Sequence, residues 1–158
     1  MRAWRVAKER RATDLTGMGA AIAGGRWNHP RTPAVYMGLS PAICSLETFV
    51  HTNGEPVEGM KITEFELPED RGLYLDLENE LLPPGWNSIP YDRPSMDFGT
   101  RWLQSRSHLG LIVPSAILPL ERNMVINPFH PEARLIKVLE VYDFTFDPRM
   151  FERQGTPQ

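Results

Sequence analysis

The sequence has a single cysteine, Cys44, among its 158 residues. One cysteine can form neither a disulfide within the chain nor a thiolate metal cluster. We expect it to be a small, partly buried core residue, because free cysteine usually behaves as a small hydrophobe. The four histidines lie far apart in the sequence and form no metal-type pair, so no metal site is predicted.

Long apolar runs and a clustered positive charge are also missing. No stretch approaches the length of a membrane span, and the charged start of the chain does not resemble a signal peptide. Seventeen basic side chains against twenty acidic ones give a net charge of −3, and the basic residues are scattered. We therefore expect a cytoplasmic protein that contacts neither a membrane nor nucleic acid directly. The scattered charges do not exclude a single arginine pocket for a small anionic ligand.

The chain is long enough for one domain with a real core. Hydrophobic periodicity predicts two helices, one starting after Ser40 and one over residues 95–107 with Ser95 as its cap. Residues 17–25 are predicted to be a loop or a short helix, and the last dozen residues to be frayed. Short strands without a βαβ rhythm indicate an α+β domain around a mixed or antiparallel sheet. The strands are predicted at residues 4–7, 35–36, 60–67 with a bulge or a change of face, 72–77, 109–113, 124–126 and 135–146.

The helix after Ser40 carries the first candidate for chemistry. Ser40 is a good N-cap, a proline follows it, and Ile43, Leu46 and Val50 recur at helical spacing. Glu47 lies on the same face. A carboxylate in an apolar stripe is costly unless it is paired or faces a cleft, so Glu47 is either a functional residue or a solvated boundary residue.

Two further candidates precede this helix. Arg26 follows a glycine pair that permits a tight turn or the close approach of a ligand, and a guanidinium there suits a phosphate or pyrophosphate. Tyr36 lies on a short strand just before the helix. The structural alternatives are an ordinary surface charge for Arg26 and a core position for Tyr36.

Several segments, in this order, resemble the RES domain family, the toxin half of bacterial RES–Xre toxin–antitoxin pairs. The family is named for an arginine, a glutamate and a serine, which correspond here to Arg26, Glu47 and Ser115. The resemblance covers residues 4–144 of a single domain, 1–158, with a core at about 4–146. It departs from the family at residues 29–33, HPRTP, where relatives usually carry a glycine. The matching segments are WRV at 4–6, GGRWN at 24–28, Tyr36, the helix at 40–51, VPS at 113–115 and NPFHP at 127–131.

The resemblance implies an ADP-ribosyltransferase-like fold and an enzyme that uses NAD as a substrate, without a metal. It implies a type II toxin that breaks the nicotinamide–ribose bond, with water or phosphate as the acceptor. The alternatives are a mono-ADP-ribosyltransferase that modifies one cellular protein, and a non-catalytic binding module of the same fold. The implied partner is an Xre-type helix-turn-helix antitoxin that occludes the site, and self-association within that complex is a further expectation.

The expected catalytic roles follow from this chemistry. Breaking the bond builds positive charge on the ribose, which the carboxylate of Glu47 would stabilise. Arg26 is assigned to the pyrophosphate, where a bidentate fork suits. Tyr36 is expected to stack on the nicotinamide, and Ser115 to donate a hydrogen bond to the ribose or the carboxamide.

Three more residues, Arg5, Asn28 and Asn127, are assigned to NAD binding. Arg5 either lines the pocket or pairs with Glu47, and either Arg5 or Arg26 holds the pyrophosphate. Asn127 and His130 have a structural alternative, because Asn-Pro and His-Pro pairs are common in turns. For His130 the turn is the favoured reading.

Overall fold

The computed structural model describes residues 1–53 and 55–151. Seven strands form one sheet in the order β4-β5-β6-β2-β1-β3-β7. Neighbouring strands are antiparallel except β4 and β5, which are parallel. A mixed sheet with a few helices confirms the predicted α+β class. The strands are β1 (Arg2–Lys8), β2 (Val35–Gly38), β3 (Met60–Glu66), β4 (Tyr74–Asp76), β5 (Gly110–Pro114), β6 (Arg122–Ile126) and β7 (Lys137–Phe144), and the helices are α1 (Met18–Ala23), α2 (Pro41–His51) and α3 (Arg93–Ser105).

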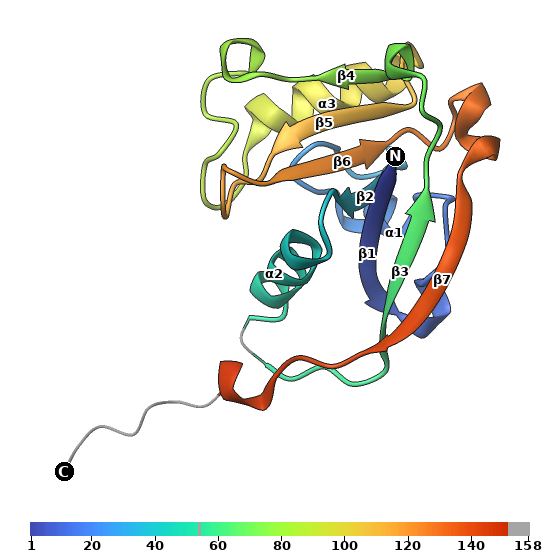
Figure 1. Ribbon diagram of the computed structural model, residues 1–158. Helices are drawn as coiled ribbons and strands as arrows, with labels where there is room; N and C mark the ends of the chain where they lie inside the picture. The colour runs from blue at the N-terminus through green and yellow to red at the C-terminus, as the bar shows by residue number, and fades with distance from the viewer. Residues whose placement is uncertain (54, 152–158) are drawn as a thin grey trace.

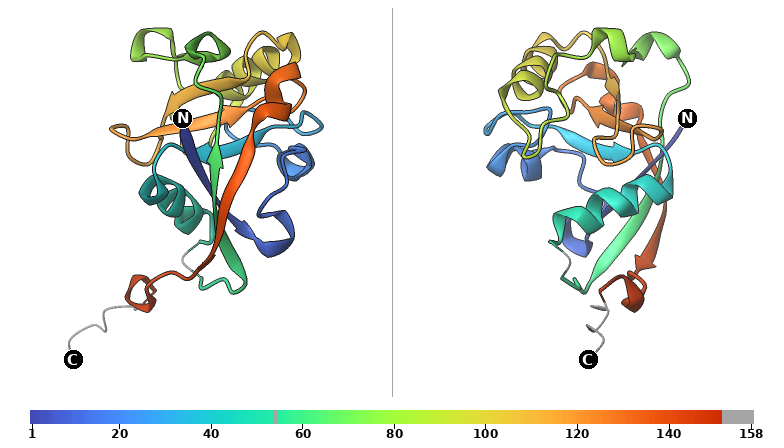
Figure 2. Two further views of the ribbon diagram at one scale, coloured as in Figure 1. Left: turned by 45° about the vertical axis from the view of Figure 1, so that its right-hand side comes forward. Right: turned by 90° about the vertical axis from the view of Figure 1, so that its left-hand side faces the viewer.

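The sheet changes direction between β2 and β1. These strands share a single residue pair, Trp4 with Gly38, whereas β1 and β3 pair along their whole length. As a result β4, β5 and β6 run roughly horizontally in Figure 1, while β1, β3 and β7 run roughly vertically. Helix α2 lies in the angle between the two halves and packs on β1, β2 and β6 (Figures 1 and 2). The inner face of α2 therefore meets residues from both halves.

The core has two main parts, one on each face of the central strands. On one face Leu111, Val113 and Val125 pack against Trp102 and Leu103 of α3. The opposite face carries a second cluster, in which β2 and β6 meet the residues of β3. Because side chains alternate along a strand, the polar residues that share a parity with Val113 and Val125 also lie toward α3. The second cluster includes Val35, Met37, Phe65, Leu67, Met124 and Ile126.

Helix α3 begins earlier than the sequence predicted. Its first residue is Arg93, and the side chain of Asp92 accepts the hydrogen bond from the Arg93 N–H. Pro94 lies in the first turn, where its missing N–H costs nothing, so it belongs to the helix although it precedes the predicted cap. Ser95, predicted as the cap, is buried inside the helix.

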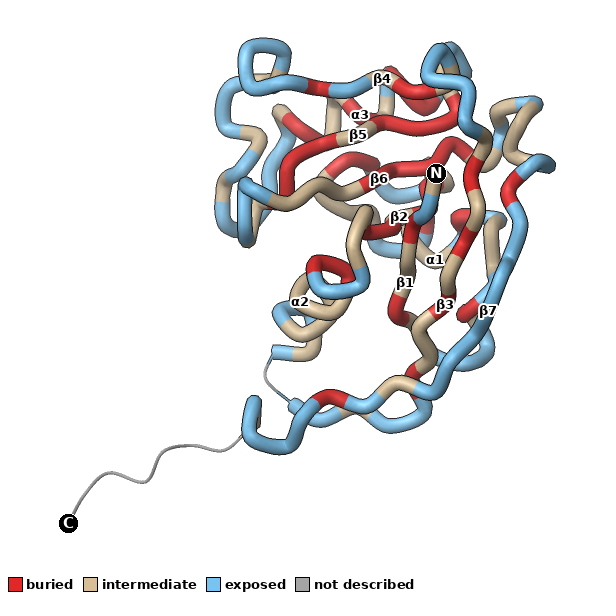
Figure 3. Tube along the Cα trace, viewed as in Figure 1, coloured by how far each residue is buried: buried red, intermediate tan, exposed pale blue. Residues whose placement is uncertain are grey.

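The last strand is shorter and more exposed than predicted. Residues Pro131–Leu135 form a 3₁₀ helix, and β7 starts at Lys137. Strand β7 is an edge strand, and nearly all of its residues are exposed (Figure 3). Val138 and Tyr142, for example, are 40% and 53% exposed. The expected irregularity of β3 is confirmed by a shift of its register with β7 between Glu64 and Phe65.

The predicted frayed tail is wrong for its first part. Pro148–Met150 form a 3₁₀ helix, and the ring of Phe151 lies 5.4 Å from that of Phe49 on α2. Residues 152–158 lie outside the described residues. The remaining 3₁₀ helices are Glu9–Arg11, Arg71–Leu73 and Asn79–Leu81, and residues 17–25 contain the short helix α1.

No helix in the described part of the chain combines the length and the apolar character that a membrane crossing requires.

Candidate active site

Glu47 projects from the inner face of α2. The helix begins as predicted, with Ser40 Oγ accepting the Ile43 N–H at 3.2 Å. Its buried residues are Ile43 and Cys44, whereas Val50, which was predicted on the buried face, is 49% exposed. Glu47 follows Ile43 by four residues and Cys44 by three, so it points the same way and is half-buried. Glu47 is thus directed toward the sheet.

Two side chains, one directly after β5 and one on β6, hold the carboxylate of Glu47. Ser115 Oγ donates to Glu47 Oε1 at 2.7 Å, and Asn123 Nδ2 donates to the same oxygen at 2.6 Å. Ser115 Oγ also accepts the N–H groups of Ile117 and Leu118, so its single proton is directed at Glu47. Ser115 is fully buried, and this proton therefore goes to Glu47 and not to a bound ligand.

Sequence reasoning missed Asn123. The strand was predicted over residues 124–126 only, which left Asn123 outside it. In β6 Asn123 pairs with Val113 and with Gly38, and it shares a parity with Val125. A polar residue two positions before a buried valine of the same strand was the available signal.

Arg26 is within electrostatic range of Glu47 and Tyr36. Burial lowers the pKa of the Arg26 guanidinium, and the charges of Glu47, Tyr36 and Tyr91 act in the opposite direction. Its Nη1 donates to two backbone carbonyls, those of Trp86 at 2.8 Å and of residue 88 at 3.0 Å. Within residues 1–53 and 55–151, Nη2 and Nε of Arg26 form no hydrogen bond, so this edge of the guanidinium is available to an anion. The group also lies over the ring of Tyr91, 5.8 Å from its centroid, a second residue that sequence reasoning missed.

The hydroxyl of Tyr36 is used within the protein. It accepts the Trp27 N–H at 2.9 Å and donates to Asn28 Oδ1 at 2.7 Å. Burial raises the pKa of Tyr36, so the phenol keeps its proton at neutral pH. A Cβ at Gly25 would lie 2.8 Å from the Tyr36 hydroxyl, which explains why a glycine precedes Arg26.

Asn28 braces the loop that presents Arg26. It is fully buried, and its Nδ2 donates to the carbonyls of Ala20, His29 and Thr32. With its oxygen bonded to Tyr36 as well, direct contact between Asn28 and NAD would require this loop to open.

Arg5 does not join the other candidates. Its Nη1 donates to the Asp14 carbonyl, and its Nη2 donates to the carbonyls of Arg11 and Ala12, at 2.6 to 2.8 Å. These bonds fasten the segment after β1. Of the two arginines considered for the pyrophosphate, Arg26 is the one whose pKa responds to the charge of Glu47.

Asn127 and His130 both stabilise the turn after β6. Asn127 is buried, donates to the Leu103 carbonyl at 2.8 Å and accepts the Phe129 N–H at 3.1 Å. His130 Nδ1 accepts the Glu132 N–H at 3.1 Å, which supports the turn reading. Asn123, at the start of β6, is the asparagine that reaches Glu47, whereas the Asn127 side chain is bonded to backbone groups of the protein.

The segment at residues 29–33, where the sequence departs from the family, is anchored on α3. His29 Nε2 lies 2.5 Å from Asp97 Oδ1, and the His29 N–H donates to Thr100 Oγ1 at 2.9 Å. The loop that carries Arg26 and Asn28 is therefore anchored directly after Asn28, although the sequence at residues 29–33 differs from the family pattern.

Cys44 is buried, as predicted, and its Sγ accepts the Val6 N–H at 3.0 Å. No group of three or more histidine, cysteine, aspartate or glutamate side chains suited to a metal ion occurs in the described parts of the chain.

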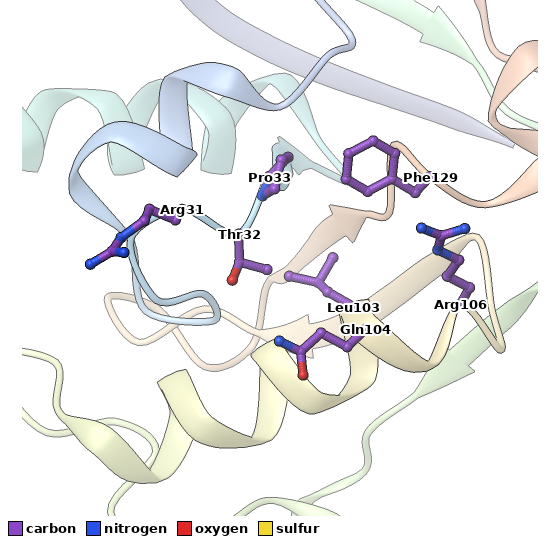
Figure 4. Close-up of a pocket in the computed structure, with 7 residues that line it drawn as sticks. All are labelled: Arg31, Thr32, Pro33, Leu103, Gln104, Arg106 and Phe129. Atoms are coloured by element: carbon purple, nitrogen blue, oxygen red, sulfur yellow. The ribbon is translucent and has the colours of Figure 1, made fainter.

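A surface pocket of 240 Å³ lies at the other end of β2 and β6 (Figure 4). Pro33 precedes β2 and Phe129 follows β6, whereas Asn123 lies near the opposite end of that pair. In Figure 4 the Arg31 side chain points away from the others. This pocket is therefore separate from the Glu47 site. Its lining residues are Arg31, Thr32, Pro33, Leu103, Gln104, Arg106 and Phe129.

The model of the RES domain matches residues 2–147. A protein of Sphingobium sp. (strain YBL2) called Prs ADP-ribosylating toxin is 41% identical, over 95% of this chain and 96% of its own length. A protein of Yersinia enterocolitica called Toxin Res is 39% identical, over 88% of this chain and 91% of its own.

Among solved structures, the crystal structure of the M. tuberculosis MbcT-MbcA toxin-antitoxin complex contains a chain of similar fold. The TM-score is 0.66 at 20% identity, over 95% of this chain and 86% of that one. At this identity the likeness concerns the fold.

Proposed function

This chain belongs to the RES domain family, and we propose that it is an NAD-consuming toxin. In the proposed reaction the bond between nicotinamide and ribose breaks, and water or phosphate takes the ADP-ribosyl group. The observation that carries the proposal is a glutamate fixed by two donors, with an arginine within electrostatic range and a tyrosine on the same face of the sheet as one of those donors. These groups come from α2, β6, the end of β5, the loop before β2, and β2 itself.

The proposed reaction makes positive charge on the ribose as nicotinamide leaves. A carboxylate held in a fixed position stabilises that charge without having to reorganise during the reaction. Glu47 is the proposed stabilising group. With water the products are ADP-ribose, nicotinamide and a proton, and with phosphate they are ADP-ribose 1″-phosphate and nicotinamide.

Arg26 and Tyr36 are proposed to bind NAD on either side of the bond that breaks. The unbonded edge of the Arg26 guanidinium suits a pyrophosphate oxygen pair. Tyr36 would contribute its ring, because both bonds of its hydroxyl are used within the protein.

NAD loss with purified protein tests this proposal. We expect the wild-type protein to consume NAD, with phosphate deciding between the two acceptors, and Glu47→Gln to lose at least about 100-fold in rate. Glu140→Gln is the matched control, because Glu140 is exposed on β7. NAD consumption that survives in Glu47→Gln would overturn the role of Glu47.

A protein acceptor is the second candidate, since the Sphingobium relative is called an ADP-ribosylating toxin. Labelled NAD separates the two: label that stays on a protein band favours transfer, and free ADP-ribose or its phosphate favours degradation. If neither occurs and Glu47→Ala leaves growth inhibition unchanged, the chain is a binding module.

We also propose that the toxin acts in the cytoplasm and is silenced by an Xre-type antitoxin, with self-association inside that complex. The fold neighbour comes from a toxin-antitoxin complex. Co-expression with the adjacent reading frame tests this: rescue of growth and co-purification are expected, and growth arrest that persists would contradict the proposal.

A further inference from the structure

The donors around Glu47 are distributed unevenly between its two oxygens. Ser115 Oγ and Asn123 Nδ2 both bond Oε1, at 2.7 and 2.6 Å. Within the described residues Oε2 accepts no hydrogen bond. Two donors on one oxygen fix the rotation of the carboxylate and leave its second oxygen free.

The position of Asn123 follows from the strand register. Asn123 pairs with Val113 on β5 and with Gly38 on β2, and Ser115 lies two residues after Val113. Asn123 and Ser115 therefore point to the same face of the sheet, the face on which α2 delivers Glu47. The amide must present its nitrogen to Glu47, because the amide oxygen would face a carboxylate oxygen without a proton between them.

We infer that Asn123 is a positioning residue that holds Glu47 Oε1, so that Oε2 is the oxygen offered to the ribose of NAD. This inference rests on the proposed function. Ser115 alone leaves the carboxylate free to turn about its single hydrogen bond, whereas a second donor from another strand removes that freedom. Asn123 thus acts through Glu47 and not through its own contact with the substrate.

Steady-state kinetics of Asn123→Ala, with Asn79→Ala as a matched control on an exposed 3₁₀ helix, tests the inference. We expect kcat to fall roughly 10- to 100-fold, because a misplaced catalytic group loses rate without losing binding. KM for NAD should change by less than about threefold. A raised KM with an unchanged kcat would mean that Asn123 binds the substrate, and unchanged kinetics would mean that it does neither. Either result overturns the inference.

The pH profile of activity of Asn123→Asp supplies a second test, because a purely structural role of Asn123 would not produce the pH dependence expected here. Protonated aspartic acid can donate to Glu47 Oε1, whereas ionised aspartate repels it. The activity of this variant should approach the wild-type value in acid and fall as the pH rises, while Asn123→Ala stays low throughout. Parallel pH profiles for the two variants would overturn the inference.

A crystal structure of Asn123→Ala gives a readout that does not depend on catalysis. We expect the Glu47 carboxylate to turn away from its wild-type orientation or to occupy more than one, and an unchanged carboxylate would contradict the inference. If wild-type protein does not consume NAD, the proposed function fails, but this measurement still decides whether Asn123 orients Glu47.

Discussion

At the scale of single residues, the two parts of the Tyr36 side chain have different roles. Its hydroxyl bonds other groups of the protein, and its ring is the part proposed to contact NAD. Tyr36→Phe removes the hydroxyl that links the Trp27 N–H to Asn28 Oδ1 and leaves these two atoms without a hydrogen-bond partner. We expect a loss of about 1–3 kcal/mol in the free energy of unfolding, because unsatisfied buried polar groups are costly. The rate of NAD consumption by the folded variant should stay close to wild type, since the ring remains.

Thermal unfolding and NAD kinetics measure the two effects separately. Tyr36→Leu, which also removes the ring, should raise KM for NAD. Tyr142→Phe is the control, because Tyr142 is 53% exposed on β7. If Tyr36→Phe is as inactive as Tyr36→Leu, the hydroxyl takes part in the chemistry.

Cys44 makes a prediction about pH. Burial raises the pKa of its thiol to about 11, above the ordinary value of 9.0. The neutral thiol therefore contributes stability that is present below about pH 9 and is lost as the pH rises toward 11, by at most about 3 kcal/mol. The free energy of unfolding measured by urea denaturation should fall more steeply over this pH range for the wild type than for Cys44→Ala.

The tyrosines with raised pKa values occur in both proteins, so the difference in slope isolates the thiol. Equal slopes would show that the thiol does not titrate differently in the folded and unfolded states. Alkylation of native protein at neutral pH should also be slow, and fast after unfolding.

At the scale of elements, local sequence signals predicted helix α2 but did not predict which residues contact its glutamate, Glu47. A serine cap and a first-turn proline act within one turn, so the helix and the inward direction of Glu47 followed from neighbouring residues. Asn123 depends on the register of three strands. Asn127 was assigned to NAD binding from a sequence motif, and a motif contains no information on strand register.

Gly38 sets how close α2 comes to the sheet. A Cβ there would lie 2.9 Å from the Cβ and backbone nitrogen of Cys44, so Gly38→Ala must push the helix outward. We expect a loss of about 1–3 kcal/mol in stability. NAD consumption should fall as well, because Glu47 moves away from Asn123.

Gly72→Ala is the matched control, since its added methyl would meet only the exposed carboxylate of Asp70. Urea denaturation and NAD kinetics provide the measurements. Unchanged activity in a destabilised Gly38→Ala protein would show that the site tolerates a displaced helix.

At the scale of the whole molecule, the candidate site depends on contacts between distant parts of the chain. Glu47 is separated from Ser115 by 68 residues and from Asn123 by 76. The free end of α2 is held by residues beyond the last strand, because the ring of Phe49 lies 5.6 Å from that of Phe146 and 5.4 Å from that of Phe151. The C-terminal 3₁₀ helix therefore belongs to the support of the site.

Phe151→Ala tests this support. Removing the ring takes away an aromatic partner of both Phe49 and Phe146, so we expect a loss of about 1–3 kcal/mol and a lower melting temperature. Met150→Ala is the control, because Met150 is 44% exposed and should change stability by less than about 0.5 kcal/mol. Hydrogen exchange should rise in the last turn of α2 in Phe151→Ala but not in Met150→Ala. If exchange rises evenly along the chain, the aromatic cluster stabilises the fold as a whole and gives α2 no particular support.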